Sequence, residues 1–196
     1  MQFVPTDRNI ADALRYMRVP PAGRDEEMTR AVRGAFMKLE DVITPRSVYG
    51  RFHIAHVDGG IELEGAYIRS ENIAKLTAGS DECYLFAATL GQETDRQIAL
   101  AQSRNMLDGV ILDACAGVRI DVYIDGVIRG EIEPSLREGE RLTHRFSPGY
   151  GDLSMTVTED IIALLSATKR IGLSVTHSLM MTPLKSVTAV IGLCGR

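Results

Sequence analysis

The sequence lacks several features that would each place a protein in a familiar class. Its 196 residues include only three cysteines, which lie in apolar runs without CxxC spacing. A disulfide framework or a tetrahedral zinc site is therefore not expected, and we predict that Cys83, Cys115 and Cys194 are buried free thiols. The net charge of −4 and the lack of a Lys/Arg cluster argue against nucleic-acid binding.

Long apolar runs are absent as well. No stretch reaches the roughly 18 residues that a membrane-spanning helix needs, and no basic region followed by an apolar segment opens the chain. We therefore expect a cytoplasmic protein with no part in a membrane. With 45% hydrophobic and 24% charged residues, the composition is that of an ordinary globular protein, and the length suits one domain over residues 1–196.

Helix-like and strand-like segments alternate along the chain, which predicts a mixed α and β fold. Thr6 and Asp25 have the positions of N-cap residues for two amphipathic helices, the first of which ends before Pro20 and Pro21. The other predicted elements are a strand at 47–55, a hairpin at Asp58-Gly59, a helix opened by Ser70 and closed by Gly79, a central strand at 82–90, a helix from near Glu93, a helix at 159–172, and strands at 173–179 and 186–193.

The segment from 105 to 137 carries two conflicting patterns. Residues 118–133, VRIDVYIDGVIRGEIE, alternate with period two around Asp125 and Gly126, which by itself predicts a hairpin. Immediately upstream, apolar residues recur every four positions, as in a buried helix. The residues of this second pattern are Met106, Val110, Ala114 and Val118.

Common catalytic and nucleotide-binding motifs are missing. The chain has no GxxxxGK[ST] or GxGxxG phosphate loop and no GxSxG nucleophile elbow. His53 and His56 form HxxH, but on a strand this spacing points the two rings to opposite faces, so a shared metal is not expected. An independent enzyme that uses Asp152, His144 or His177 as a base stays an alternative without a motif behind it.

One loop combines unusual residue types: RFSPGYGD, residues 145–152. Arg145 offers a planar fork of donors for a carboxylate, Gly149 lets backbone amides approach closely, and Tyr150 offers an aromatic face to a positive centre. This set suits S-adenosylmethionine, which has an amino-acid end, a sulfonium and an adenine. The alternative is a Pro-Gly turn in which Arg145 holds the loop carbonyls.

The RxxxGY pattern of this loop resembles the S-adenosylmethionine-binding motif of the activation domain of cobalamin-dependent methionine synthase. Residues 170–193 are similar to the segment that follows the motif in that domain, and the stretches FAATLG and LDA resemble free-standing versions of it. The resemblance implies a single α+β domain with a twisted, largely antiparallel β-sheet and packed helices. It also implies that residues 105 to roughly 125 are helical, which overrules the hairpin pattern.

The resemblance further implies how the ligand is bound. Arg145 should hold the methionine carboxylate, backbone groups of the loop 146–149 should contact adenine, and Tyr150 should line the sulfonium side. A family glutamate falls on Asp121, which would face the ligand's ammonium group. The residues expected to bind S-adenosylmethionine are thus Arg145, Phe146, Ser147, Pro148, Gly149, Tyr150 and Asp121.

Departures from the family pattern bear on the same ligand. An N-terminal aspartate that helps to bind it in the full-length enzyme has no acidic counterpart in LRYMRVPP, residues 14–21. The enzyme form also continues past the last shared strand and supplies a tyrosine, so we expect a more open pocket here. Gly151 and Asp152 replace a short Pro-Ala-Cys-Pro run of the enzyme.

By resemblance the chain is an accessory subunit for methionine biosynthesis. It would bind S-adenosylmethionine and dock on a cobalamin-binding methionine synthase or corrinoid protein, supporting the reductive remethylation of cob(II)alamin with electrons from flavodoxin or ferredoxin. Cobalamin would come only through that partner, and the chain would be a component of the methyltransferase without activity of its own. The alternative is a non-catalytic ligand-binding or interaction protein of the same fold with a different small-molecule ligand or partner.

Overall fold

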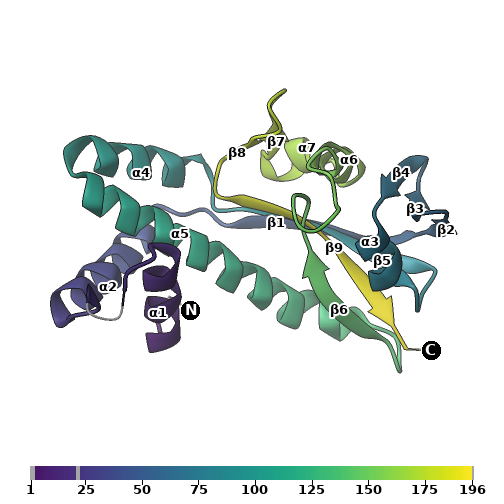
Figure 1. Ribbon diagram of the computed structural model, residues 1–196, viewed down its shortest axis with the longest axis horizontal. Helices are drawn as coiled ribbons and strands as arrows, with labels where there is room; N and C mark the ends of the chain where they lie inside the picture. Colours follow the sequence, from purple (N-terminus) through teal and green to yellow (C-terminus); the bar gives the residue numbers. More distant parts are fainter. Residues whose placement is uncertain (1–2, 21–22, 196) are drawn as a thin grey trace.

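A four-stranded sheet with helices on both faces organises the chain (Figure 1). The structure is a computed structural model, and it describes residues 3–20 and 23–195. Neighbouring strands of the sheet are antiparallel, which confirms the predicted α+β class with a largely antiparallel sheet. In spatial order the strands are β1 (Arg46–His53), β5 (Glu82–Thr89), β9 (Ser186–Cys194) and β6 (Arg141–Phe146).

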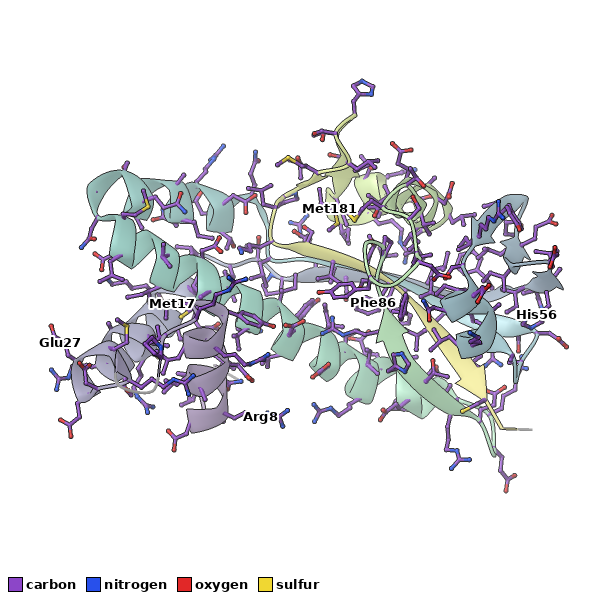
Figure 2. The ribbon with its side chains drawn as sticks, viewed as in Figure 1. Arg8, Met17, Glu27, His56, Phe86 and Met181 are labelled. Carbon is purple, nitrogen blue, oxygen red and sulfur yellow. The ribbon has the colours of Figure 1, made fainter. Side chains whose placement is uncertain are left out.

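β5 is buried along its whole length because both of its faces are covered. Tyr84 and Phe86 point into one apolar cluster, and Cys83 and Leu85 point into the other. A strand covered on both faces reads as a continuous apolar run and not as an alternating one, which is the pattern that predicted a central strand here. Figure 2 shows Phe86 near the middle of the sheet.

The helices on one face of the sheet form the first apolar cluster, together with Tyr84 and Phe86 of β5. Among them, α5 lies between the sheet and the two N-terminal helices (Figure 1). Thr6 and Asp25 cap α1 and α2 as predicted, since each side chain accepts a backbone N–H of the first turn. Pro21, expected to help end the first helix, lies outside the described residues. The helices are α1 (Asp7–Tyr16), α2 (Glu26–Glu40), α4 (Gln92–Arg104) and α5 (Met106–Val127).

The conflict at residues 105–137 is resolved as a helix, although Met106 and Val110, two of the four residues whose spacing predicted a buried helix, are exposed and only Ala114 and Val118 are buried. α5 passes through Asp125 and Gly126 without a break and continues into a π-helical turn at Ile128–Ile132 and a 3₁₀ turn at Glu133–Ser135. The helix contacts α1, α2, α4 and β5, so apolar residues cover most of its circumference. A helix that is buried on several sides loses the 3.6-residue pattern, and its remaining polar residues happened to alternate like those of a strand.

The second cluster lies on the opposite face of the sheet. A small three-stranded sheet lies at its edge. The predicted hairpin is confirmed there, with β2 and β3 joined by the turn at Asp58-Gly59. The third strand, β4, was not predicted. Ser70 caps α3 as expected. The elements on this side are β2 (Ala55–Val57), β3 (Gly60–Leu63), β4 (Ala66–Arg69), α3 (Glu71–Thr77), α6 (Val157–Leu164) and α7 (Ala167–Ile171).

Two predictions near the C-terminus were wrong in detail. The single helix expected at 159–172 is broken into α6 and α7, because Ser166 adopts a left-handed backbone with φ of 51°. The strand expected at 173–179 shrinks to β7 (Ser174–Val175), which pairs with β8 (Met181–Thr182) in a two-stranded ribbon.

Cys83 and Cys115 are buried free thiols, whereas Cys194 is partly exposed, contrary to the prediction for all three. Burial raises the pKa of Cys83 and of Cys115 to about 12. No helix among the described residues combines the length and the apolar character needed to cross a membrane.

Candidate functional site

The loop after β6 and the distant Asp121 line one cleft, whose volume is about 530 Å³. All of the predicted ligand residues except Gly149 lie in its wall. That they bind a ligand stays a prediction, but the fold brings them together from α5, the end of β6 and the loop that leads to α6. The predicted residues in the wall are Asp121, Arg145, Phe146, Ser147, Pro148 and Tyr150.

Gly149 lies in this loop, next to the wall residue Met155. Its backbone φ is 90°, and a Cβ atom there would lie 2.5 Å from the Sδ atom of Met155, so glycine suits the position on both counts. The N–H of Gly149 donates to the carbonyl of Leu153 at 2.8 Å, and the N–H of Tyr150 donates to the carbonyl of Ser147 at 3.2 Å. The loop is therefore closed by its own backbone hydrogen bonds.

Asp152 ties the loop to the first turn of α3. Its carboxylate accepts hydrogen bonds from the Ser70 hydroxyl at 2.5 Å, the Glu71 N–H at 2.7 Å and the Asn72 side-chain amide at 2.8 Å. These bonds, with that of Ser70 the strongest, lower the pKa of Asp152 to about 2. A carboxylate held in its ionised form by so many donors is a poor general base, so the structure gives the enzyme alternative at Asp152 no support.

Arg145, Asp121 and Tyr16 form a continuous hydrogen-bonded chain, in which Arg145 and Asp121 lie in the cleft wall and Tyr16 lies outside it. The guanidinium of Arg145 donates to one carboxylate oxygen of Asp121 at 2.5 Å, and the Tyr16 hydroxyl donates to the other oxygen at 2.9 Å. The side chains of Arg145 and Asp121 are 28% and 35% exposed, so both can be reached from solvent. Arg145 is thus paired with a side chain of α5, which is not the loop-bracing role of the alternative interpretation.

The contact of Tyr16 with Asp121 was not expected. It lies in LRYMRVPP, the stretch that shows no counterpart of the family's aspartate, and its hydroxyl reaches Asp121 from the end of α1. Its ring packs on Gly117 of α5, where a Cβ atom would lie 3.3 Å from the ring. Desolvation and then the bond to Asp121 raise the pKa of Tyr16 to about 12, so its hydroxyl stays a donor at neutral pH.

The rest of the cleft wall combines apolar and hydroxyl side chains. Met181 on β8 lies between the sheet and α6–α7 (Figure 2), and it belongs to the stretch that resembles the family. Tyr150, by contrast, is 70% exposed at the cleft mouth. The wall residues that were not assigned to the site from the sequence are His144, Met155, Thr158, Met181, Ser186, Val187 and Thr188.

The four histidines lie in three separate parts of the fold. His144 is exposed in the cleft wall and packs edge-on against Phe146, with ring centres 6.3 Å apart, while His177 is exposed in the turn between β7 and β8. His53 ends β1 and His56 lies in β2, so they do not share a strand as predicted, and both line one cleft. His53 approaches Glu82 at 3.8 Å, whereas His56 bonds to the carbonyl of Ser80. Over residues 3–20 and 23–195, no three His, Cys, Asp or Glu side chains are arranged to hold a metal.

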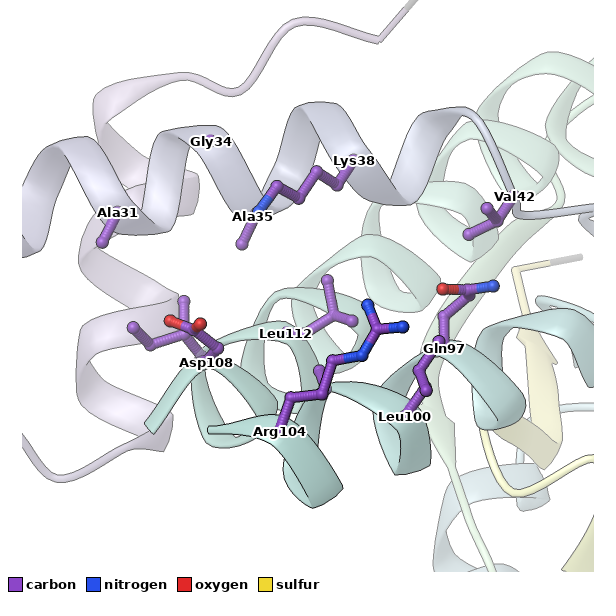
Figure 3. Close-up of a pocket in the computed structure, with 12 residues that line it drawn as sticks. Ala31, Gly34, Ala35, Lys38, Val42, Gln97, Leu100, Arg104, Asp108 and Leu112 are labelled. Atoms are coloured by element: carbon purple, nitrogen blue, oxygen red, sulfur yellow. The ribbon is translucent and has the colours of Figure 1, made fainter. Parts of the chain in front are cut away.

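A second cleft, of about 400 Å³, lies between α2 and the α4–α5 hairpin (Figure 3). Small residues of α2, Ala31, Gly34 and Ala35, leave the space open. Lys38 lies along α2 on one side, and Arg104 extends into the space from the other. None of the predicted ligand residues lies here. The cleft at β6 is the candidate site because it joins an Arg–Asp pair, an aromatic face and a glycine-containing loop in one place.

The fold is similar to that of the MetH reactivation domain in a crystal structure with AdoHcy bound. The TM-score is 0.63, and the match covers 94% of this chain and 74% of that chain at 19% sequence identity. No protein-family model matches the sequence, and no curated protein is detectably similar to it. The likeness confirms the fold that was expected from the family resemblance. It does not show which ligand this chain binds.

Proposed function

We propose that the chain binds S-adenosylmethionine in the β6 cleft and acts as an accessory subunit for the reductive remethylation of cob(II)alamin. Its client would be a cobalamin-dependent methionine synthase or a related corrinoid methyltransferase. The observation that carries the proposal is the convergence of Arg145, Asp121 and Tyr150 with the closed loop in one cleft. The fold's likeness to a domain whose crystal structure holds AdoHcy, the demethylated form of this ligand, supports the same ligand class.

The Arg145–Asp121 pair matches the two charges of an amino-acid end. In the proposed complex Arg145 binds the carboxylate and Asp121 binds the ammonium, so the ligand replaces one internal pair by two external ones. Because the internal pair is partly exposed, breaking it costs about 0.2–1 kcal/mol. The ligand forms two such pairs where one is lost, so the exchange adds one charge-assisted interaction.

The other walls suit the rest of the molecule. Met155, Met181 and Val187 give an apolar surface for the adenine, and the loop 146–149 lies beside it with its backbone groups. The exposed ring of Tyr150 at the mouth can stack against the positive sulfonium. At about 530 Å³ the cleft is within the usual range of sites for small ligands.

The methyl acceptor would be supplied by a partner. A cobalamin protein brings the cobalt, and flavodoxin or ferredoxin brings the electron that makes this cobalt nucleophilic enough to accept the methyl group. The work of this chain is to bind the donor, to hold its sulfonium at the cleft mouth near Tyr150, and to release AdoHcy afterwards.

Reactivation of an oxidised corrinoid methyltransferase tests the proposal. The full chain, S-adenosylmethionine and a low-potential reductant together should convert the absorption spectrum of the oxidised cofactor into that of methylcobalamin, and omission of any one should prevent it. Equal recovery without the chain would overturn the accessory role. So would methylation of an acceptor by the chain in the absence of a corrinoid protein.

A second candidate is a non-catalytic binding protein of the same fold with a different small ligand. It is favoured by the observation that Arg145 and Asp121 already satisfy each other within the chain. Calorimetric titration separates the two candidates: binding of S-adenosylmethionine and AdoHcy supports the first, and binding of neither by the folded protein supports the second.

A further inference from the structure

Asp121 lies in the cleft wall at the centre of the hydrogen-bonded chain, between Arg145 inside the cleft and Tyr16 outside it, and each of its carboxylate oxygens has a different partner. One oxygen accepts from Arg145 at 2.5 Å, and the other accepts from Tyr16 at 2.9 Å. The partners come from separate parts of the fold, β6 and α1, while Asp121 itself is on α5. The orientation of this carboxylate is therefore set by helix α1 as well as by the sheet.

We infer that Tyr16 is a positioning residue that makes the site selective for ligands with both an ammonium and a carboxylate group. The inference rests on the proposed function. When such a ligand enters, Arg145 turns to the ligand carboxylate, and the oxygen of Asp121 that it leaves accepts from the ligand ammonium. Tyr16 keeps its hold on the second oxygen, so the carboxylate stays in place during the exchange.

The geometry explains why an incomplete ligand is at a disadvantage. A ligand with a carboxylate alone would draw Arg145 away from Asp121. Asp121, which Tyr16 holds in place, would then be an unpaired negative charge beside the ligand carboxylate, and the two would repel each other. A ligand with an ammonium alone would have to compete with Arg145 for the same oxygen of Asp121. 5′-Methylthioadenosine has neither group, so it leaves the internal pair intact and binds only through its adenosine part.

The test is calorimetric titration of the full chain with AdoHcy and with 5′-methylthioadenosine. Tyr16→Phe removes the hydroxyl but keeps the ring that packs on Gly117. We expect it to weaken AdoHcy binding by about three- to tenfold, because the ligand must then order the Asp121 side chain that Tyr16 no longer holds, and to leave the affinity for 5′-methylthioadenosine unchanged. Tyr67→Phe is the matched control, because this half-exposed tyrosine donates its hydroxyl to the carbonyl of Asp58 in the small sheet.

A double-mutant cycle checks that Tyr16 acts through Asp121. In an Asp121→Asn background, Tyr16→Phe should change AdoHcy affinity by less than about twofold, because the oriented carboxylate is already lost. Equal AdoHcy affinity in the wild type and in Tyr16→Phe would disprove the inference and leave the proposed function standing. Equal weakening for both ligands would show that Tyr16 only shapes the cleft, which also disproves it. If the wild type bound 5′-methylthioadenosine as tightly as AdoHcy, or bound neither, the proposed function itself would fail, and the inference with it.

Discussion

Replacing Arg145 with alanine removes the cation of the candidate site without disturbing the backbone around it. The residue pairs with Ile191 through the β6–β9 ladder, and the loop beyond it is closed by backbone bonds that do not involve its side chain. The variant loses the charge-assisted bond to the ligand carboxylate, about 1.5–3 kcal/mol, or roughly ten- to a hundredfold in affinity. Asp121 also loses its partner, but both side chains are partly exposed, at 28% and 35%, so stability should fall by less than about 1 kcal/mol.

Calorimetry with S-adenosylmethionine and AdoHcy measures the affinities, and urea denaturation measures the stability. Arg141→Ala is the matched control, since this arginine is exposed at the far end of the same strand and lies outside the cleft wall. Its affinities should equal those of the wild type. If Arg145→Ala also bound with wild-type affinity while it lost stability, Arg145 would be a structural brace for Asp121, and the reasoning about the carboxylate would be refuted.

Further predictions concern the fold. Gly126→Ala should stabilise the protein by roughly 0.5–1 kcal/mol in urea denaturation, because Gly126 lies within helix α5, alanine favours a helix more than glycine does, and a Cβ atom there would meet no other atom within 4 Å. A loss of stability would contradict the helix at this position. Phe86→Ala should cost about 3–5 kcal/mol in the same assay, since Phe86 is fully buried in the central strand, and a loss below about 1 kcal/mol would show that the core is looser than described. The pKa of Asp152 falls from 3.8 to about 2 on folding, so its contribution to stability is present above pH 3.8 and is lost as the pH falls through 2. Between these pH values the wild type should lose its stability advantage over Asp152→Asn, and a constant difference would argue against these hydrogen bonds.

Much of the local structure could be predicted because its causes lie within a few residues. Thr6, Asp25 and Ser70 each cap a helix by accepting the N–H of a residue three positions later, so the partners are adjacent in sequence. The Asp58-Gly59 turn is equally local, and the unbroken apolar run of β5 reports burial on both faces. In the candidate site, the turn of the RxxxGY segment could also be predicted, because its proline and glycine lie within a few residues of each other.

Contacts between distant segments could not be predicted from the residues. Whether 118–133 formed a hairpin or a helix depended on what surrounded it, and the residue pattern alone favoured the wrong one until the family resemblance was considered. The break at Ser166 was not predicted because no glycine or proline marks it, and residues on both sides of it belong to the second apolar cluster.

By itself, the sequence determined the caps, the hairpin turn, the central strand and the turn that follows Arg145, because each depends on neighbours along the chain, whereas β6, the strand that carries Arg145, was not predicted. Only the tertiary structure decided that Asp121 lies opposite Arg145 and that Tyr16 reaches the same carboxylate across 105 residues. These contacts exist because α1 packs on α5 while the end of β6 approaches α5 from the sheet. Such packing is a property of the whole core, and no pattern near Tyr16 encodes it.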